Sequence, residues 1–465
     1  SDDAYTPEGR AGARPDYCTT TYCRILKQLY PDVPIVIGGI EASMRRLTHY
    51  DYWADKLMPS ILVDSGADLL VYGMGEQAIL EIAQKGICHS IPQTAYLESD
   101  ASALPQEAIR LASHEQALRD KRVHAENFRY IEIESNKIHQ NTIIQAVGKQ
   151  FVVVNPSYEP MSTDELDRIY DLPYQYTPHP KYKDKHIPAF EMIRWSVCMH
   201  RGCFGGCAFC TISAHQGKQI VSRSKESILR QIKQLSQLPD WHGVLTDLGG
   251  PSANMYGMEG KDKALCKQCA RASCLHPAIC KNLNQQFGPI IDIYKTVDQL
   301  PYVKHAFVGS GIRYDLMDEN YARQLITRHV SGRLKVAPEH CADKVLRIMR
   351  KPSWENYLKF RQLFLRINDE AGLKQQLIPY FISSHPGCTK LEMQQLADET
   401  KKMRYRPEQE QDFTPTPMTL STTMFYTGID PYTGQKVYVA RTAEEKKEQN
   451  QYFFWYKKKT TPFRK

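Results

Sequence analysis

The segment Cys203-Phe204-Gly205-Gly206-Cys207-Ala208-Phe209-Cys210 carries three cysteines at the spacing C-x3-C-x2-C. Cysteine thiolates hold iron–sulfur clusters, normally with one thiolate for each iron. Three thiolates on a four-iron cluster leave one iron open, in the way that a catalytic zinc keeps an open position. The neighbouring glycines allow the backbone to wrap closely around a bulky inorganic core. The spacing therefore predicts a 4Fe–4S cluster on Cys203, Cys207 and Cys210.

A zinc site and unrelated buried thiols are the alternatives to a cluster in this segment. A zinc site that takes a fourth ligand from Cys198 or His200 would also use three close cysteines. Three unrelated buried thiols would need no metal. The spacing favours the cluster over zinc, and zinc over chance.

An alternation of strand and helix patterns surrounds the cysteines from residue 191 to residue 430. Strands are expected at Arg194–Val197, Gly243–Leu248, His305–Val308, Leu334–Val336, Leu377–Ile382 and Met418–Tyr426. Helical spacing lies between them at 222–238, 318–330, 342–350, 354–370 and 390–404. Repeated strand-then-helix units form parallel sheets, and five or six of them suggest a partial (β/α)6 barrel. The cysteines follow the first strand, at the barrel end where catalytic groups gather.

Residues 1–150 are expected to form a separate Rossmann-like α/β domain. Val33–Ile40 and Asp68–Gly73 are β-branched, apolar runs that contain or end in glycine, and a helix-like stretch follows the second. The chain begins Ser-Asp-Asp without methionine, so this domain is expected to be truncated at its N-terminus. Residues 151–190, rich in proline and tyrosine, are predicted to be a linker, and 431–465 a basic C-terminal tail.

Composition places the chain among cytoplasmic globular proteins. Its 465 residues, 42% hydrophobic and 24% charged, suit two or three domains. A run of about 18 apolar residues is missing, which excludes a membrane span, and no secretory signal is visible. The net charge of +8 is concentrated near the end, at Lys457, Lys458, Lys459, Arg464 and Lys465. Such a tail can bind nucleic acid through phosphates, although a solvated, disordered end is the simpler interpretation.

A second cysteine group lies in the predicted insertion 252–288. Of the thirteen cysteines in the chain, this group contains Cys266, Cys269, Cys274 and Cys280. Four thiolates in a short polar segment fit a closed site, either structural zinc or an auxiliary iron–sulfur cluster, whose metal would supply the folding energy. Spacing does not separate zinc from iron–sulfur, and reduced free thiols are the remaining alternative.

The first cysteine segment, with Phe209 before its last cysteine, resembles the signature of radical S-adenosylmethionine (SAM) enzymes. Longer strings resemble the YgiQ-type radical SAM family and run from about residue 30 to about residue 430. They are Gly39-Ile40-Glu41-Ala42-Ser43, His49-Tyr50-Asp51-Tyr52-Trp53, Leu70-Val71-Tyr72-Gly73-Met74-Gly75-Glu76, Asp247-Leu248-Gly249-Gly250-Pro251, Val336-Ala337-Pro338-Glu339-His340, Ser383-Ser384-His385-Pro386-Gly387 and Asp412-Phe413-Thr414-Pro415-Thr416-Pro417.

This resemblance implies an enzyme that cleaves SAM reductively to a 5′-deoxyadenosyl radical, with an electron from a flavodoxin- or ferredoxin-type protein. It implies that Gly249, Gly250 and Pro251 contact the methionine amino group of SAM. Gly309, Ser310 and Arg313 are candidates for its carboxylate or ribose, and Glu339 for its ribose hydroxyls. As the alternative, each glycine pair is only the turn that ends a strand.

The resemblance also bears on cobalamin and on the reaction. The N-terminal α/β part resembles the later half of the cobalamin-binding-type domain found in some radical SAM enzymes. Relatives that bind cobalamin often carry D-x-H-x-x-G, whose histidine ligates cobalt. This string is absent here, so either it lies upstream of Ser1 or cobalamin is not bound in that way, and bound cobalamin is not expected. Methyl or methylthio transfer to RNA is the alternative reaction, and a non-catalytic iron–sulfur or zinc scaffold is the alternative from another class. Residues that line a pocket are scattered over six strand ends, so the sequence names no substrate.

Overall fold

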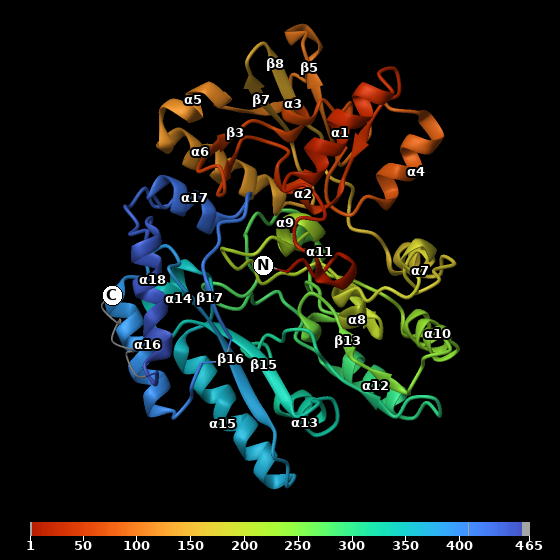
Figure 1. Ribbon diagram of the computed structural model, residues 1–465, viewed down its shortest axis with the longest axis vertical. Helices are drawn as coiled ribbons and strands as arrows, with labels where there is room; N and C mark the ends of the chain where they lie inside the picture. Colours follow the sequence, from red (N-terminus) through yellow and green to blue (C-terminus); the bar gives the residue numbers. More distant parts are fainter. Residues whose placement is uncertain (1, 408, 458–465) are drawn as a thin grey trace, which may run out of the picture.

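The first unit of the protein is a six-stranded sheet covered by helices. The computed structural model describes residues 2–407 and 409–457 and places this unit above a second one (Figure 1). In spatial order the sheet contains β1 (Val36–Ile37), β4 (Leu69–Val71), β5 (Thr94–Glu98), β8 (Gln150–Val154), β7 (Thr142–Val147) and β6 (Ala108–Leu111). β8 thus occupies the beginning of the segment predicted to be a linker.

The sheet is mixed, whereas the alternation of strands and helices had suggested a parallel one. β1 pairs with β4 and β6 with β7 in parallel, and the other three pairs are antiparallel. A two-residue turn at Gly148, with φ of +60°, joins β7 directly to β8. So short a connection produces an antiparallel hairpin, because a parallel pair needs a long crossover.

Helices and one hairpin complete this unit. The hairpin consists of β2 (His49–Asp51) and β3 (Lys56–Met58). The helices are α1 (Cys18–Leu29), α2 (Gly39–Met44), α3 (Ile61–Ser65), α4 (Glu76–Lys85), α5 (His114–Arg119) and α6 (Lys121–Ser135). Two further helices, α7 (Thr163–Tyr170) and α8 (Pro188–Ile193), precede the second unit.

The second unit is the partial barrel that the strand–helix alternation predicts. Its strands are β9 (Ser196–Cys198), β12 (Val244–Leu245), β13 (Asp247–Gly249), β14 (His305–Ala306), β15 (Arg333–Glu339), β16 (Gln376–Ser383) and β17 (Gln409–Asp412). β9 pairs with β13, β12 with β14, and β15 with β16 and then β17, all in parallel. The α/β class and the six-position barrel are confirmed, with β12 and β13 sharing the second position.

Helices lie around the outside of these strands (Figure 1). They are α10 (Lys225–Ser236), α12 (Gly288–Asp298), α13 (Glu319–Arg328), α14 (Asp343–Ile348), α15 (Trp354–Glu370) and α16 (Lys390–Lys402). Ile228, Ile232 and Leu235 of α10 are fully buried, as their helical spacing predicts. Shorter elements are β10 (His200–Arg201), α9 (Ile212–Gln216), β11 (Val221–Ser222) and α11 (Lys263–Lys267).

The predicted last strand, Met418–Tyr426, is wrong because the chain forms α17 (Leu420–Thr427) there. The Thr419 side chain caps this helix by accepting a hydrogen bond from the Thr422 N–H, and Gly428 ends it with φ of +72°. Nearly all of α17 is buried, so its β-branched residues show no helical periodicity. The last strand is instead β17, whose sequence Gln-Glu-Gln-Asp is entirely polar.

The C-terminal segment is not the solvated tail that its charge had suggested, as far as Lys457. Helix α18 (Ala443–Gln451) packs on β16, β17 and α16. Gln449 is 1% exposed and donates its side-chain amide to the Cys388 carbonyl oxygen, at 2.8 Å. Lys458, Lys459, Arg464 and Lys465 lie outside the described residues. Of the helices in the described part of the chain, none combines the length and apolar character that a membrane span requires.

Candidate functional site

The three-cysteine segment forms a loop between β10 and α9, and hydrogen bonds fix its backbone at both ends. The Cys203 N–H donates to the Gly217 carbonyl at 3.1 Å, and the Ala208 N–H to the Met349 carbonyl at 2.9 Å. From α17, the Ser421 N–H donates to the Ala208 carbonyl at 2.9 Å. The helix that replaced a predicted strand thus helps to hold the cysteine loop.

Two glycines of this loop occupy positions where another residue would not fit. Gly202 has φ of +86°, and a Cβ there would lie 2.0 Å from the Gln219 carbonyl oxygen. Gly206 has φ of +59°, and its Cβ would lie 2.2 Å from the Ala272 carbonyl oxygen. Both the left-handed backbone and the close approach require glycine, in accordance with the tight wrapping expected from the sequence.

The three thiols lie close together, and two of them face a cavity. Cys207 and Cys210 line this cavity, which we call the cysteine-loop cavity. Burial raises the pKa of the Cys203 thiol to about 11 and that of Cys210 to about 12, and the nearby Cys207 raises both further. The Gly205 N–H and the Arg313 guanidinium each lie 3.4 Å from a thiol sulfur, of Cys203 and Cys207 respectively. Donors to sulfur are a feature of iron–sulfur sites.

The donor set fits a cluster better than the zinc alternative. The Cys198 thiol, at the end of β9, donates to the carbonyl oxygen of His200, at the start of β10, at 3.1 Å. The His200 ring packs against Gly250, where a Cβ would lie 2.4 Å from it. Within residues 2–407 and 409–457, no three His, Cys, Asp or Glu side chains are arranged to hold a single metal ion. Three thiols in a glycine cradle beside a cavity leave room for a larger inorganic group.

The glycines expected to contact SAM are held by the ends of two neighbouring strands. The Gly249 carbonyl accepts the Met199 N–H at 2.7 Å, so it belongs to the sheet. The Asp247 carboxylate accepts the N–H groups of Gly309 and Ser310, at 2.9 and 3.0 Å, and also the Ser310 hydroxyl. Asp247 therefore ties the end of β13 to the turn after β14.

Arg313 is placed differently from the expectation that it faces an open ligand site. Its guanidinium donates in bidentate fashion to the Asp315 carboxylate, at 2.8 and 2.7 Å. The remaining nitrogen of the fork contacts the Cys207 thiol. Arg313 thus supports the cysteine loop. Its pairing with Asp315 was not predicted from the sequence.

Two strand ends carry strained backbone next to buried polar side chains. Glu339 has φ of +71° and is 8% exposed; burial raises its pKa, and Lys351 lies 3.9 Å away. Ser384, just after β16, has φ of +61°, and its buried hydroxyl has no partner among the described residues. Non-glycine residues in this conformation often occur at functional sites. Ser384 belongs to one of the strings quoted above, although no role was expected for it.

The second cysteine group packs directly on the first loop, from which it is separated by about 70 residues of sequence. The Cys274 N–H donates to the Phe204 carbonyl at 2.9 Å, and the Ser273 hydroxyl to the Gly205 carbonyl at 2.7 Å. Within the group, the Cys280 N–H donates to the Cys274 carbonyl at 2.7 Å. Burial and the neighbouring thiols raise the pKa of Cys266 and of Cys274. The four thiols therefore share one neighbourhood, beside the cysteine loop.

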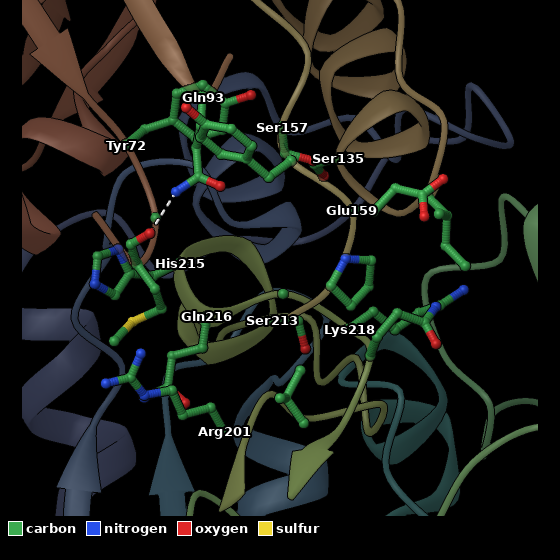
Figure 2. Close-up of a pocket in the computed structure, with 18 of the residues that line it drawn as sticks. Tyr72, Gln93, Ser135, Ser157, Glu159, Arg201, Ser213, His215, Gln216 and Lys218 are labelled. Carbon is green, nitrogen blue, oxygen red and sulfur yellow. Dashed lines mark hydrogen bonds between the residues drawn. The ribbon is translucent and has the colours of Figure 1, made fainter. Parts of the chain in front are cut away.

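A larger pocket of about 940 Å3, which we call the interdomain pocket, lies between the two units. Figure 2 shows Tyr72 and Gln93 of the first unit on one side of it, and Arg201, Ser213, His215, Gln216 and Lys218 of the barrel on the other. Gln93 donates to the Met74 carbonyl at 2.6 Å. The pocket adjoins the cysteine-loop cavity, since both are lined by Arg46, Ser135, Asn136, Ser213 and Ala214.

Comparison with family models matches almost the whole chain. Residues 1–196 match the model described as radical SAM N-terminal, and 197–368 match that of the radical SAM superfamily. Residues 408–462 match a domain of unknown function, DUF3362.

The chain is also similar to curated proteins of several organisms. It is 56% identical to a UPF0313 protein of Bacteroides thetaiotaomicron, over 96% of this chain and 77% of the relative. A UPF0313 protein of Porphyromonas gingivalis is also 56% identical, over 96% and 74%. One of Methanocella arvoryzae is 46% identical, over 96% and 76%.

Among solved structures, the chain resembles TsrM of Kitasatospora setae, a radical SAM methyltransferase. The TM-score is 0.44 at 14% identity, over 90% of this chain and 63% of TsrM. The cobalamin-dependent SAM radical enzyme OxsB gives a TM-score of 0.43 at 12% identity, over 86% of this chain and 44% of OxsB.

Proposed function

Because this chain belongs to the UPF0313 family of radical SAM proteins, we propose that Cys203, Cys207 and Cys210 are the ligands of its 4Fe–4S cluster. The chain is a radical SAM enzyme, and such enzymes bind a 4Fe–4S cluster and SAM. When bound, the pair supplies a 5′-deoxyadenosyl radical that removes a hydrogen atom from the substrate. The observation that carries this proposal is the loop itself: three close thiols in a glycine cradle, two of them facing the cysteine-loop cavity.

The strand ends around the loop supply the remaining binding groups. We propose that Gly250 and Pro251 contact the methionine part of SAM, beside Gly249, whose carbonyl is held in the sheet. Asp247 positions Gly309 and Ser310 for the same ligand. Glu339, buried and strained at the end of β15, is proposed to accept hydrogen bonds from the ribose.

Arg313 acts on the loop rather than on the ligand in this proposal. Its fork is taken by Asp315, and its third nitrogen contacts the Cys207 sulfur. We propose that this donor orients the Cys207 sulfur, in support of the cluster.

The second cysteine group is proposed to bind zinc or an auxiliary iron–sulfur cluster through Cys266, Cys269, Cys274 and Cys280. The four thiols share one neighbourhood on a mostly exposed segment, and among the described residues they are not yet arranged around a single ion. A bound metal would draw them together and stabilise this segment. A four-thiolate site is closed, so it serves structure or electron transfer and not catalysis. Its contact with the cysteine loop, through Cys274 and Phe204, suits electron transfer.

Two further components complete the proposal. Radical SAM enzymes need a reductant, and we propose a flavodoxin- or ferredoxin-type protein as the electron donor. We also propose that no histidine of residues 1–465 ligates cobalamin in the D-x-H-x-x-G mode, since that string is absent from them. A visible spectrum unchanged by incubation with hydroxocobalamin and gel filtration is expected, and a retained cobalamin band would contradict this.

The test is anaerobic iron and sulfide analysis with electron paramagnetic resonance, on the wild type and on the Cys203→Ala/Cys207→Ala/Cys210→Ala variant. We expect a loss of about four irons per chain in the variant and, in the wild type, a signal that shifts on addition of SAM. About eight irons that fall to about four would make the second group a cluster as well. Zinc without iron in the reconstituted protein would overturn the proposal and leave a metal-stabilised scaffold.

A further inference from the structure

Arg46 is a buried cation without an anionic partner. It follows α2 in the first unit and is 4% exposed. One guanidinium nitrogen donates to the Ser43 carbonyl at 2.6 Å, and the group lies 4.6 Å from the centre of the Tyr72 ring. Its Nε is buried without an acceptor among the described residues, and of the groups around Arg46 only the Tyr72 hydroxyl has an electrostatic influence on it. A buried charge left in this state is costly, so an anionic ligand that pairs with it would offset that cost.

Arg201, which also lines the interdomain pocket, is a second arginine with an unsatisfied guanidinium nitrogen. Its Nη2 lies 2.8 Å from a Glu76 carboxylate oxygen, whereas its Nη1 is buried without an acceptor among the described residues. Arg46 and Arg201 come from different units, and both line the interdomain pocket. Among the described residues that line this pocket, two buried side-chain atoms have no hydrogen-bond partner, Arg46 Nε and Arg201 Nη1. Both are hydrogen-bond donors. Guanidinium forks match carboxylate and phosphate groups.

The position of Arg46 relates this site to the reactive centre. Arg46 lines the interdomain pocket and also the cysteine-loop cavity, which Cys207 and Cys210 line. The acidic residue of the interdomain lining is Glu159, whose side chain is 61% exposed and lies 3.6 Å from His139. A small anion held at Arg46 therefore meets little repulsion from carboxylates of the pocket lining. The remainder of the bound ligand can extend toward the cysteines.

We propose that the interdomain pocket binds a substrate that carries a carboxylate or phosphate group, and that Arg46 receives this anion with help from Arg201. This assignment rests on the proposed function, since it places the substrate beside the cysteine-loop cavity. It names a class of substrate, a small organic anion, and a binding residue that lies outside the barrel.

The test uses the reconstituted enzyme with inorganic phosphate and, separately, acetate as probes, at constant ionic strength. We compare the wild type with Arg46→Met, and with Arg366→Met as a control, because Arg366 is an exposed arginine paired with Glu319. The wild type and the control are expected to show a saturable rise of the unfolding temperature with a probe. Arg46→Met should weaken this response about tenfold or more, the usual effect of losing a charged hydrogen bond.

A second readout separates a binding role from a structural one. Without probe, Arg46→Met is expected to unfold at no lower temperature than the wild type, because replacing an unpaired buried charge by an apolar group is neutral or stabilising. A fall of about 4 °C or more would make Arg46 structural and overturn the proposal. A wild type without a saturable response to either probe would also overturn it.

The carboxylate of SAM is the other source of such an anion, and spectroscopy distinguishes it. If Arg46→Met no longer shows the SAM-dependent change of the cluster signal, the anion belongs to SAM and the substrate assignment is overturned. A retained change supports the substrate. The phosphate titration needs no turnover, so its result stands apart from a wild type that fails to cleave SAM, which would refute the proposed function instead.

Discussion

The two cysteine groups lie against each other, yet the protein holds them in opposite ways. In the loop of Cys203, Cys207 and Cys210, most residues from Gly202 to Ala208 are buried, and their backbone hydrogen bonds reach α17 and Met349, which follows α14. In the segment of Cys266, Cys269, Cys274 and Cys280, residues 261–265 are exposed, and its buried side chains include Ser273, Leu275 and Leu283.

The two cysteine groups therefore obtain their geometry in different ways. Packing and glycine positions shape the first loop before any cluster binds, which preorganises the open coordination that catalysis needs. In the second segment, Leu275 and Leu283 pack in the core, but the stretch around Cys266 and Cys269 is mostly exposed. A bound metal therefore has to supply much of the order of that stretch. The first group is therefore expected to lose chemistry when it is mutated, and the second to lose structure.

The largest expected effect is on catalysis in the Cys203→Ala/Cys207→Ala/Cys210→Ala variant. SAM cleavage under strong reductant should fall to the background of the assay, because the electron for the reaction comes from this cluster. Far-ultraviolet circular dichroism should stay that of the wild type, since the loop backbone is held by other elements. Unfolding of this variant, or residual SAM cleavage, would contradict a purely chemical role for the first cysteine group.

Next in size is the loss of order in the Cys266→Ser/Cys274→Ser variant. Without its metal, the insertion should be cut rapidly by trypsin at the exposed Lys261, Lys263 and Lys267. The measurement is limited proteolysis followed by mass spectrometry, with the wild type as the matched control. Equal cleavage rates in the two proteins would show that the insertion is ordered without metal.

The contact between the two groups is tested by Gly206→Ala. This change adds a Cβ 2.2 Å from the Ala272 carbonyl oxygen at φ of +59°, so the loop and the insertion have to separate. We expect a destabilisation of about 2–4 kcal/mol and a reduced iron content. Gly217→Ala is the control, because its φ is +95° but nothing lies within 4 Å of its Cβ; about 1 kcal/mol is expected there. The measurement is urea unfolding, and equal losses of unfolding free energy in Gly206→Ala and Gly217→Ala would contradict the steric explanation.

The smallest expected effect is on the pH dependence of stability. The His385 ring lies 6.0 Å from the Phe209 ring of the first loop, and burial lowers the His385 pKa to about 3. In the unfolded chain a histidine takes up a proton near pH 6.5. Stability is therefore complete above about pH 6.5 and falls progressively as the pH is lowered toward about 3. His385→Gln should have a shallower fall of the unfolding temperature between pH 7 and pH 5; an unchanged slope would exclude this residue as a cause.

Much of the barrel was predictable because its signals are local. The apolar spacing of α10 and the largely apolar run of β16 each lie within one element, and both were expected. The radical SAM family and the enzyme class, expected from the cysteine spacing and the longer strings, are confirmed by the relatives. The cluster ligands themselves stay a prediction.

The errors have one physical cause, which is that burial by distant segments outweighs local propensity. β17 is Gln-Glu-Gln-Asp and carries no strand signal, yet it completes the sheet through hydrogen bonds to β16. α17 has the composition of a strand but is surrounded by packed chain. The C-terminal segment is charged, but it buries Gln449 and Phe453 against the barrel.

The spacing of the cysteines is enough to predict the chemistry of the cysteine loop. Its three thiols and its glycines lie within a few residues of one another, so their spacing limits their geometry with little help from the rest of the chain. What surrounds that loop depends on the tertiary structure. The second cysteine group reaches it across the insertion, and Arg46 and Arg201 meet at one pocket from different units. Such contacts arise from the packing of whole elements, and no pattern within a short segment records them.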